Sequence, residues 1–172
     1  MSEWASLIRD VPDFPEPGIL FKDVTPLLAD AEGFAACLHD MAAPWRDGGI
    51  EAVCGIESRG FIFGAALAPM LGVGFVPLRK AGKLPADTVG VDYALEYGHA
   101  RLEIHRDALT PGQRVLIVDD VLATGGTLAA SRELVEQTGA KVAGAAVVLE
   151  LAFLDGRSRW IDGVPLESLV CY

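Results

Sequence analysis

The chain has 172 residues, of which 51% are hydrophobic and 22% are charged. These proportions exclude a disordered chain and fit one domain of ordinary size, residues 1–172, with its own core. The 24 acidic and 14 basic residues give a formal net charge of −10 at pH 7. Such a charge repels nucleic acid and anionic membranes, so we expect neither as a partner, and an anionic ligand needs a local basic cluster.

The cysteines and the N-terminus favour a cytoplasmic protein. Cys37, Cys54 and Cys171 share no metal-ligand spacing, which indicates reduced thiols rather than a disulfide framework. The first ten residues lack the basic and apolar regions of a signal peptide. The apolar stretch 61–78 is interrupted by glycines and prolines, which argues against a membrane span.

The N-terminal segment predicts two helices separated by a loop. Ser2 begins a short amphipathic helix that ends before Pro12, and the three prolines and the glycine of residues 12–18 predict an extended or turning loop. Asp30 is placed as the N-cap of a second helix that runs to the glycines at 48 and 49. The apolar stripe of that helix, expected in the core, consists of Phe34, Leu38, Met41 and Trp45.

The middle of the chain alternates between strand and helix patterns. Residues 51–55 and 74–78 predict strands, and residues 60–71 predict an apolar helix between them. Residues 79–93 are polar, contain glycine and proline and lack either period, which predicts a long exposed loop of the kind that usually has a function. Residues 91–97 and 101–105 alternate enough to form a hairpin around Gly98.

The C-terminal half continues the alternation, with a strand at 115–118, a helix at 125–137 and a strand at 142–149. Strands separated by helices predict an α/β fold whose central, mostly parallel sheet carries helices on both faces. Ligands collect at the carboxyl ends of such strands. Asp119 and Asp120 follow one strand, and Glu57, Ser58 and Arg59 follow another.

Residues 114–127, R-V-L-I-V-D-D-V-L-A-T-G-G-T, combine a buried strand, two acids and a small-residue loop before a helix. Backbone N–H groups at a helix N-terminus bind anions, and glycines let the main chain approach a phosphate closely. The loop consists of Ala123, Thr124, Gly125, Gly126 and Thr127. Side chains alternate along a strand, so the two carboxylates diverge and suit the two hydroxyls of a ribose, or a Mg²⁺ carried by a polyphosphate. The alternative is a solvated acidic loop.

This motif resembles the phosphoribosyl pyrophosphate motif of type I phosphoribosyltransferases. Segments 14–23, 55–61, 79–85 and 95–98 resemble the adenine-specific branch, and the match extends from about Val11 to Leu151. The resemblance implies a single domain with a small N-terminal hood at about residues 1–30 and a flexible catalytic loop at about 79–98. It also implies a homodimer.

The resemblance assigns basic and polar residues to pyrophosphate. Glu57, Ser58 and Arg59 correspond to the pyrophosphate-binding loop, although the residues alone fit a surface turn capped by Ser58 equally well. Arg79, Lys80 and Lys83 alone fit a solvated face, whereas the resemblance implies a mobile lid that closes on the pyrophosphate.

The resemblance also places the purine. Phe21 provides a stacking surface, Leu20 and Lys22 provide main-chain groups, and Leu151 closes the other face. Glu96 is implicated in proton transfer at the purine with Tyr97 beside it, although the sequence alone favours exposed strand residues there.

The expected reaction is the conversion of adenine and phosphoribosyl pyrophosphate to AMP and pyrophosphate. Its cofactor is Mg²⁺, held mainly by the substrate, with no direct protein ligand expected and with Asp119 and Asp120 as candidate ligands through water. Alternatives are a phosphoribosyltransferase for a 6-oxopurine or xanthine, a catalytically inactive sensor of phosphoribosyl pyrophosphate, and a receiver-like domain with Asp119 and Asp120 as its phosphorylation pocket. The three histidines, His39, His99 and His105, receive no role.

Overall fold

The computed structural model describes residues 3–94, 99–160 and 163–172. The chain divides into two compact units, Met1–Asp40 and Met41–Tyr172. The expectation of one domain over residues 1–172 stays a prediction. Among the helices of the described ranges, none is long and apolar enough to cross a membrane.

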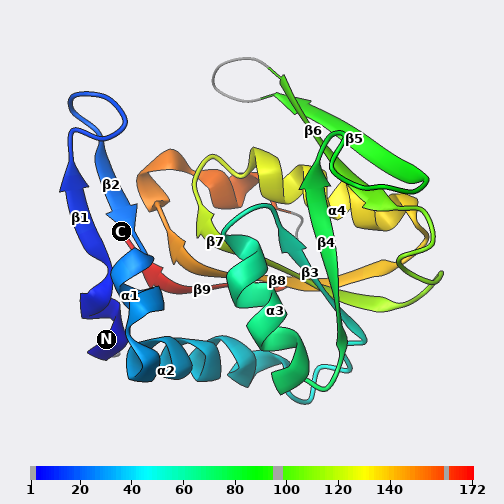
Figure 1. Cartoon of the computed structure of the whole chain (residues 1–172), viewed down its shortest axis with the longest axis horizontal. Helices are drawn as coiled ribbons and strands as arrows, with labels where there is room; N and C mark the ends of the chain where they lie inside the picture. Colours follow the sequence, from blue (N-terminus) through cyan, green and yellow to red (C-terminus); the bar gives the residue numbers. More distant parts are fainter. Residues whose placement is uncertain (1–2, 95–98, 161–162) are drawn as a thin grey trace. The chain divides into compact units, whose positions relative to one another are not determined.

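The first unit contains a strand pair and short helices, coloured blue in Figure 1. Its elements are η1 (Glu3–Leu7), β1 (Arg9–Pro12), β2 (Leu20–Asp23), α1 (Thr25–Ala29) and most of α2 (Ala31–Ala42). β1 and β2 pair antiparallel, with Val11 opposite Phe21. Ion pairs of 2.6 Å join Arg9 to Asp23 and Lys22 to Asp10 across the two strands.

The helix predicted before Pro12 is wrong beyond Leu7. Residues 9–12 form a strand because their backbone groups pair with residues 20–23, a partner that local periodicity does not reveal. The N-cap of α2 is confirmed, since the Asp30 carboxylate accepts a 2.7 Å hydrogen bond from the Gly33 N–H. The predicted helix is too long, because α2 ends at Ala42 and Pro44, which lacks an N–H, lies in the 3₁₀ turn η2 (Ala43–Trp45).

The second unit is built on a sheet that has seven strands within the described residues, in the order β5-β6-β4-β3-β7-β8-β9. Its strands are β3 (Ala52–Ile56), β4 (Gly74–Lys80), β5 (Thr88–Ala94), β6 (His99–His105), β7 (Arg114–Leu122), β8 (Lys141–Glu150) and β9 (Leu166–Cys171). Neighbours from β4 to β9 are parallel, whereas the β4–β6 and β5–β6 pairs are antiparallel. The expected mostly parallel sheet is therefore confirmed.

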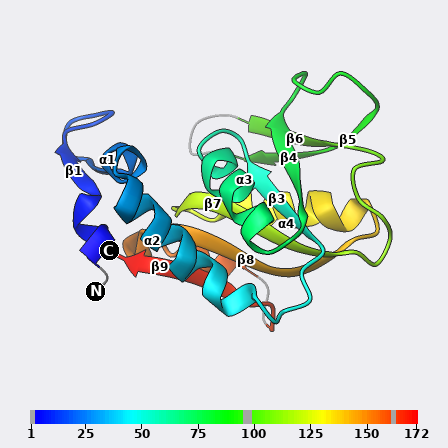
Figure 2. The same cartoon turned by 60° about the horizontal axis from the view of Figure 1, so that its bottom comes forward.

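Two crossover helices place the functional edge of this sheet. α3 (Gly60–Met70) connects β3 to β4, and α4 (Gly126–Gln137) connects β7 to β8. The two connections run in opposite directions along the sheet, so right-handed crossovers put the helices on opposite faces. Figures 1 and 2 show both helices against the sheet. The strand order reverses between β3 and β7, and ligands bind at the carboxyl ends of strands at such a switch point.

The strand that the sequence predicted to be buried lies in the core of the second unit. Val115 to Val118 are completely buried, as are Val147 to Leu149 of the neighbouring β8. Phe63 and Leu67 of α3 are also completely buried. This continuous apolar layer is what a parallel sheet covered on both faces requires.

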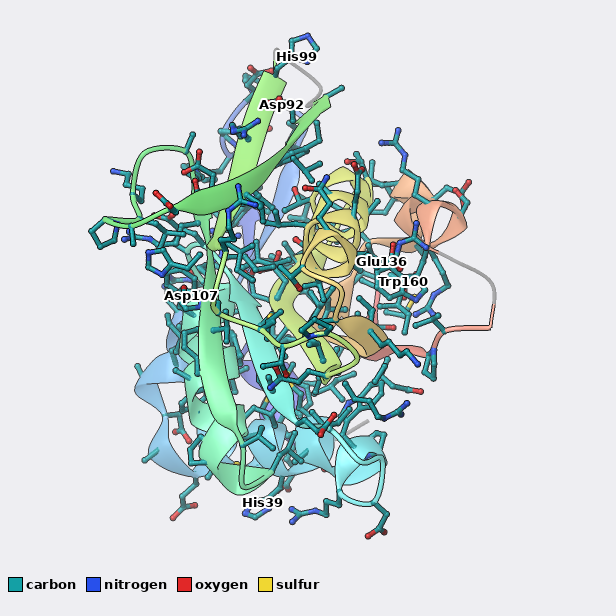
Figure 3. The ribbon with its side chains drawn as sticks, turned by 90° about the vertical axis from the view of Figure 1, so that its right-hand side faces the viewer. His39, Asp92, His99, Asp107, Glu136 and Trp160 are labelled. Carbon is teal, nitrogen blue, oxygen red and sulfur yellow. The ribbon has the colours of Figure 1, made fainter. Side chains whose placement is uncertain are left out.

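The long loop predicted at residues 79–93 is wrong in extent. Arg79 and Lys80 belong to β4, and residues 88–94 form β5, which pairs with β6 to make the predicted hairpin. Figure 3 shows His99 at one end of β6 and Asp107 beyond the other. This hairpin is at the sheet edge and half-exposed, so its sequence is too polar to identify both strands. The turn residue Gly98 lies outside the described residues.

Candidate active site

A cavity of about 440 Å³ lies in the second unit at the carboxyl ends of β3 and β7. The turn after β3 contributes Glu57, Ser58 and Arg59. The end of β7 and the following loop contribute residues 119–125, 127 and 128. Lys80, Tyr93 and Ala100 complete its lining. The cavity thus joins the acidic pair, the glycine loop and the Arg59 turn, which the sequence analysis had linked only through their expected strand ends.

The glycine loop forms an anion site from its backbone. Gly125 has φ 79°, a left-handed conformation, and is the N-cap of α4. Its carbonyl accepts the first helical hydrogen bond, from Ala129 N–H at 3.0 Å. The N–H groups of the first turn have no partner within the helix and point out from its N-terminus, where the helix dipole favours a negative charge.

A second backbone segment supports this loop from behind. The short helix η4 (Gly156–Arg159) follows β8 and the turn η3 (Ala152–Leu154). A Cβ atom on Gly125 would lie 2.2 Å from the Gly156 carbonyl oxygen, and one on Gly156 would lie 2.0 Å from the Ala123 carbonyl oxygen. The two main chains are therefore in direct contact, and neither glycine can carry a side chain without displacing the other segment.

The acidic pair lies inside β7 rather than after its end, because β7 continues to Leu122. Both residues line the cavity. Asp120 is 5% exposed and forms an ion pair with the Arg59 Nε. Asp119 is half-buried, and its Oδ1 accepts a 2.9 Å hydrogen bond from the Asp120 N–H. This ion pair connects the β7 loop to the β3 turn.

Ionisation of the Asp119 carboxyl group is electrostatically unfavourable. Burial and repulsion from the Asp120 carboxylate raise the pKa of Asp119 well above its ordinary value. A second cation or a pair of hydroxyl donors in the cavity would favour its ionised form. The site therefore suits a ligand that presents positive charge or hydroxyls to these acids.

Glu57 anchors β4 beside the cavity. Its carboxylate accepts hydrogen bonds from the Lys80 N–H at 2.8 Å and from the Arg79 guanidinium at 3.4 Å. Burial raises the pKa of Glu57, but these hydrogen bonds outweigh it and hold that pKa below its ordinary value. Through its hydrogen bonds to Arg79 and Lys80, Glu57 fixes the strand that carries Lys80. The peptide bond between Glu57 and Ser58 is cis.

Other predicted site residues are placed differently. Arg79 donates to the Lys83 carbonyl at 3.0 Å, and neither residue lines the cavity. Leu151 also lies outside its lining, and its N–H donates to the Leu122 carbonyl at 2.9 Å. Leu20, Phe21 and Lys22 lie on β2 in the first unit. The Phe21 ring packs edge-on against the Phe14 ring, with 5.2 Å between the ring centroids. Glu96 and Tyr97 lie outside the described residues.

Sequence reasoning gave no site role to several residues around the cavity, including Val121, Leu122 and Leu128 of its lining. Tyr93 and Ala100 line it from the hairpin, and the first of these was hidden in a segment interpreted as a loop. Gly156 supports the phosphate loop. The sequence signal for this role is a glycine directly after an aspartate, and Asp155 adopts a left-handed conformation with φ 51°. Within the described part of the chain, no group of three or more His, Cys, Asp or Glu residues is placed to hold a metal ion.

Comparison with known proteins identifies the family. The phosphoribosyl transferase domain family matches residues 22–162. An adenine phosphoribosyltransferase of Xanthomonas campestris pv. campestris is 57% identical over 171 residues, covering 99% of this chain and 92% of the relative.

Solved structures agree. The crystal structure of adenine phosphoribosyltransferase from Thermoanaerobacter pseudethanolicus superposes with a TM-score of 0.94 at 50% identity, covering 99% of this chain and 98% of the other. The enzyme from Saccharomyces cerevisiae, solved with an imino-altritol bisphosphate and adenine, gives a TM-score of 0.91 at 42% identity, covering 97% and 96%. The chain therefore belongs to the adenine phosphoribosyltransferase family, enzymes of purine salvage that transfer the 5-phosphoribosyl group from phosphoribosyl pyrophosphate to adenine.

Proposed function

We propose that the cavity between β3 and β7 binds phosphoribosyl pyrophosphate and is where this enzyme forms AMP and pyrophosphate. The observation that carries the proposal is one cavity lined by an acidic pair, a left-handed glycine at a helix N-terminus and an arginine turn. These three features match the ribose, the 5′-phosphate and the pyrophosphate of a single substrate.

The 5′-phosphate is assigned to the loop from Ala123 to Thr127. The N–H groups at the start of α4 supply donors, and the Thr124 and Thr127 hydroxyls add two more. Binding energy at this remote phosphate is available to orient C1′ for reaction.

The ribose hydroxyls are assigned to Asp119 and Asp120. Hydroxyl donors at the Asp119 carboxylate would favour its ionised form, which its burial and its neighbour otherwise oppose. By holding the ribose, the two acids fix C1′ between the leaving group and the incoming base.

Two adjacent carboxylates also fit Mg²⁺, which prefers oxygen ligands and is usually bound by one or two carboxylates together with substrate phosphates. We assign the ion mainly to the substrate, with Asp119 and Asp120 as its candidate ligands through water. When bound, Mg²⁺ stabilises the negative charge that develops on pyrophosphate.

The pyrophosphate is assigned to Ser58, Arg59 and Lys80, which line the cavity. Arg59 has to exchange part of its contact with Asp120 for the ligand. Glu57 acts indirectly, by fixing the Lys80 backbone. Arg79, in β4, and Lys83, in the segment that follows β4, are assigned to the same subsite through closure of that segment.

The adenine ring is assigned to Phe21 as stacking surface, with Leu20 and Lys22 main-chain groups at its edge and Leu151 and Tyr97 as further contacts. Phe21 is half-buried. The related yeast enzyme was solved with adenine, which supports a purine site in this family.

The chemistry needs little covalent assistance from the protein. The C1′–O bond breaks and its electron pair leaves with pyrophosphate, while N9 of adenine forms the new bond to C1′ from the opposite side. Cationic groups at Arg59 and Lys80 stabilise the departing charge. Glu96 is assigned to accept the proton that adenine N9 loses, as a general base.

The enzyme is further proposed to be a cytoplasmic homodimer. The dimer is what the family resemblance implies, and sedimentation velocity at micromolar concentration tests it. A single monomeric species would contradict it.

Pyrophosphate release tests the function. The enzyme is supplied with phosphoribosyl pyrophosphate and Mg²⁺, and adenine, hypoxanthine, guanine and xanthine are offered separately. We expect turnover with adenine alone, because a site that pairs with the 6-amino group leaves a buried polar group unpaired against a 6-oxopurine. Turnover with an oxopurine would contradict the base assignment, and tight substrate binding without turnover would favour a sensor.

A further inference from the structure

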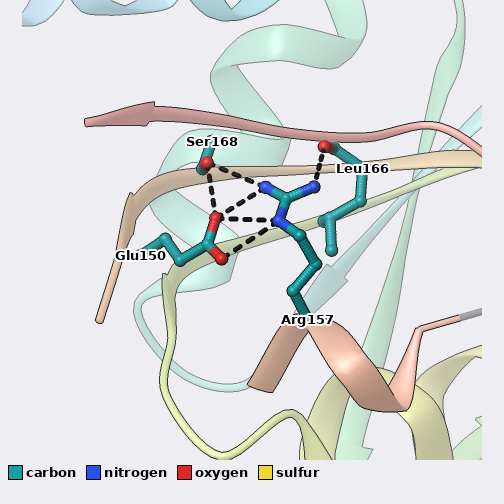
Figure 4. Close-up of polar contacts among 4 residues, drawn as sticks. All are labelled: Glu150, Arg157, Leu166 and Ser168. Carbon is teal, nitrogen blue, oxygen red and sulfur yellow. Dashed lines mark hydrogen bonds and ion pairs between the residues drawn. The ribbon is translucent and has the colours of Figure 1, made fainter. Parts of the chain in front are cut away.

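A polar cluster around the buried Glu150, with Arg157 exposed and Ser168 partly exposed, fixes η4 to the sheet (Figure 4). Arg157 donates to both Glu150 carboxylate oxygens, with Nε 3.0 Å from Oε1 and Nη2 2.6 Å from Oε2. Its Nη1 donates to the Leu166 carbonyl at 2.8 Å, and Nη2 reaches the Ser168 Oγ at 3.0 Å. The Ser168 hydroxyl donates to Glu150 Oε2 at 2.7 Å. One side chain on η4 therefore joins β8 and β9.

The geometry of this cluster is tightly constrained. Glu150 is 6% exposed, and a carboxylate this buried needs its charge and hydrogen bonds satisfied. The Arg157 hydrogen bonds outweigh burial and lower the pKa of Glu150. A planar guanidinium that binds a carboxylate through two nitrogens fixes both distance and orientation, which a single ammonium would not.

The neighbour of Arg157 in sequence is Gly156, whose backbone touches the phosphate loop. The space between Gly156 and the carbonyl of Ala123 is too small for a single carbon atom, since a Cβ there would approach to 2.0 Å. A shift of η4 by a fraction of an ångström would therefore move the loop as well, because close-packed backbone leaves no void to absorb it.

The same cluster is anchored to the strand that leads into the loop. Glu150 lies opposite Leu122 in the β7–β8 ladder, and Leu122 immediately precedes the loop. The Leu151 N–H then donates to the Leu122 carbonyl at 2.9 Å. Arg157 and Glu150 thus connect the base of the phosphate loop to the segment that supports its curve.

We propose that Arg157 and Glu150, assisted by Ser168, are positioning residues that set the curvature of the 5′-phosphate loop from outside the cavity. The proposal rests on the assignment of the 5′-phosphate to residues 123–127. None of the three is among the described residues that line the cavity, so they act through Gly156. Their loss should weaken the 5′-phosphate subsite and spare the pyrophosphate subsite.

The test replaces both charges at once. The variant E150Q/R157Q removes the ion pair without leaving a buried unpaired charge, which would destabilise the fold for a different reason. The variant R157K keeps the charge but loses the two-nitrogen contact and the bond to the Leu166 carbonyl. The matched control is R114Q, since Arg114 also binds backbone carbonyls, those of Gly48 and Gly49, but at the opposite end of β7.

Inhibition constants separate the subsites. Ribose 5-phosphate reports on the phosphate loop, and pyrophosphate reports on the β3 turn; melting curves and the KM for adenine are measured on the same samples. Because a displaced loop loses hydrogen bonds to the charged phosphate, we expect ribose 5-phosphate and phosphoribosyl pyrophosphate to bind about ten to a hundredfold more weakly to E150Q/R157Q. Binding of pyrophosphate and the KM for adenine should stay within about twofold, with R157K intermediate and R114Q like the wild type.

Unchanged ribose 5-phosphate binding in a folded E150Q/R157Q variant would overturn the proposal. Equal weakening of all ligands would also overturn it, because that result indicates general destabilisation. The same selective loss in R114Q would overturn it too, because Arg114 lies at the opposite end of β7 and binds the carbonyls of Gly48 and Gly49. If E150Q/R157Q does not fold, R157K decides: selective weakening of ribose 5-phosphate supports the proposal, and wild-type constants contradict it. Failure of the function itself is recognised separately, since the wild-type enzyme would then release no pyrophosphate with adenine.

Discussion

The turns after β3 and β7 serve the same cavity but are held in place differently. The β7 loop is shaped by backbone: a left-handed Gly125 and the direct contact of Ala123 and Gly125 with Gly156. The β3 turn is positioned by side chains, through the Arg59–Asp120 ion pair and the Glu57 hydrogen bonds to β4. Backbone sites tolerate no added atom, whereas side-chain sites can exchange partners when a ligand arrives. The phosphate loop should therefore be rigid and the pyrophosphate turn adaptable.

Removing both acids should have the largest effect, because it affects both turns at once. In D119N/D120N the ribose loses its two charged acceptors, and Arg59 loses its carboxylate partner. We expect kcat/KM to fall by about a thousandfold or more, in line with the loss of preorganised polar groups at other active sites. Steady-state kinetics check this, with circular dichroism as the control for folding. Wild-type rates would remove both acids from the mechanism.

Adding a Cβ atom at Gly156 should distort the β7 loop and leave the β3 turn unchanged. In G156A the new Cβ would need to move by about 1 Å or more from the Ala123 carbonyl, so kcat/KM for phosphoribosyl pyrophosphate should fall by about a hundredfold. G74A is the matched control, because a Cβ at Gly74 of β4 meets nothing within 4 Å. Equal kinetics for the two variants would contradict the idea that the contact shapes the loop.

Replacing Arg59 should weaken the pyrophosphate subsite most, and it also removes the ion-pair partner of Asp120. We expect R59Q to bind pyrophosphate about ten to a hundredfold more weakly, because a charge-assisted hydrogen bond is lost. Ribose 5-phosphate should be affected by less than about threefold, since its phosphate contacts backbone N–H groups. Inhibition constants for both ligands provide the measurement. A larger loss for ribose 5-phosphate would reverse the assignment of the two subsites.

The smallest expected effect concerns stability and pH. The folded-state pKa of Asp119 is raised, so the folded protein binds this proton more tightly than the unfolded chain does. Stability is therefore lost as the pH rises from the ordinary value of 3.8 toward the raised pKa. D119N lacks this penalty, and without ligands it should melt at a higher temperature than the wild type at pH 7, with the difference vanishing below pH 3.8. A lower melting temperature at pH 7 would contradict the electrostatic cost at this site.

Features made by residues that are neighbours in the sequence could be predicted, whereas features made by contacts between distant residues could not. The strand at 115–118, the acids and the phosphate loop were predicted because apolar runs, glycines and acids adjoin one another in the sequence. β1, β2 and β9 were missed, and the start of β5 was placed in a loop, because these strands are short or half-exposed and owe their existence to strand partners. Gly156 and Arg157 were also missed, since their contacts with Ala123 and Glu150 exist only in the folded chain. The residues at 96 and 97 remain predictions of family resemblance.

The most direct test of the central claim is a crystal structure of the enzyme with AMP. We expect the phosphate within hydrogen-bond distance of the N–H groups at residues 124–127 and the ribose hydroxyls at Asp119 and Asp120. A phosphate bound instead by Arg59 and Lys80, with the ribose away from Asp119, would contradict the assignment of the cavity.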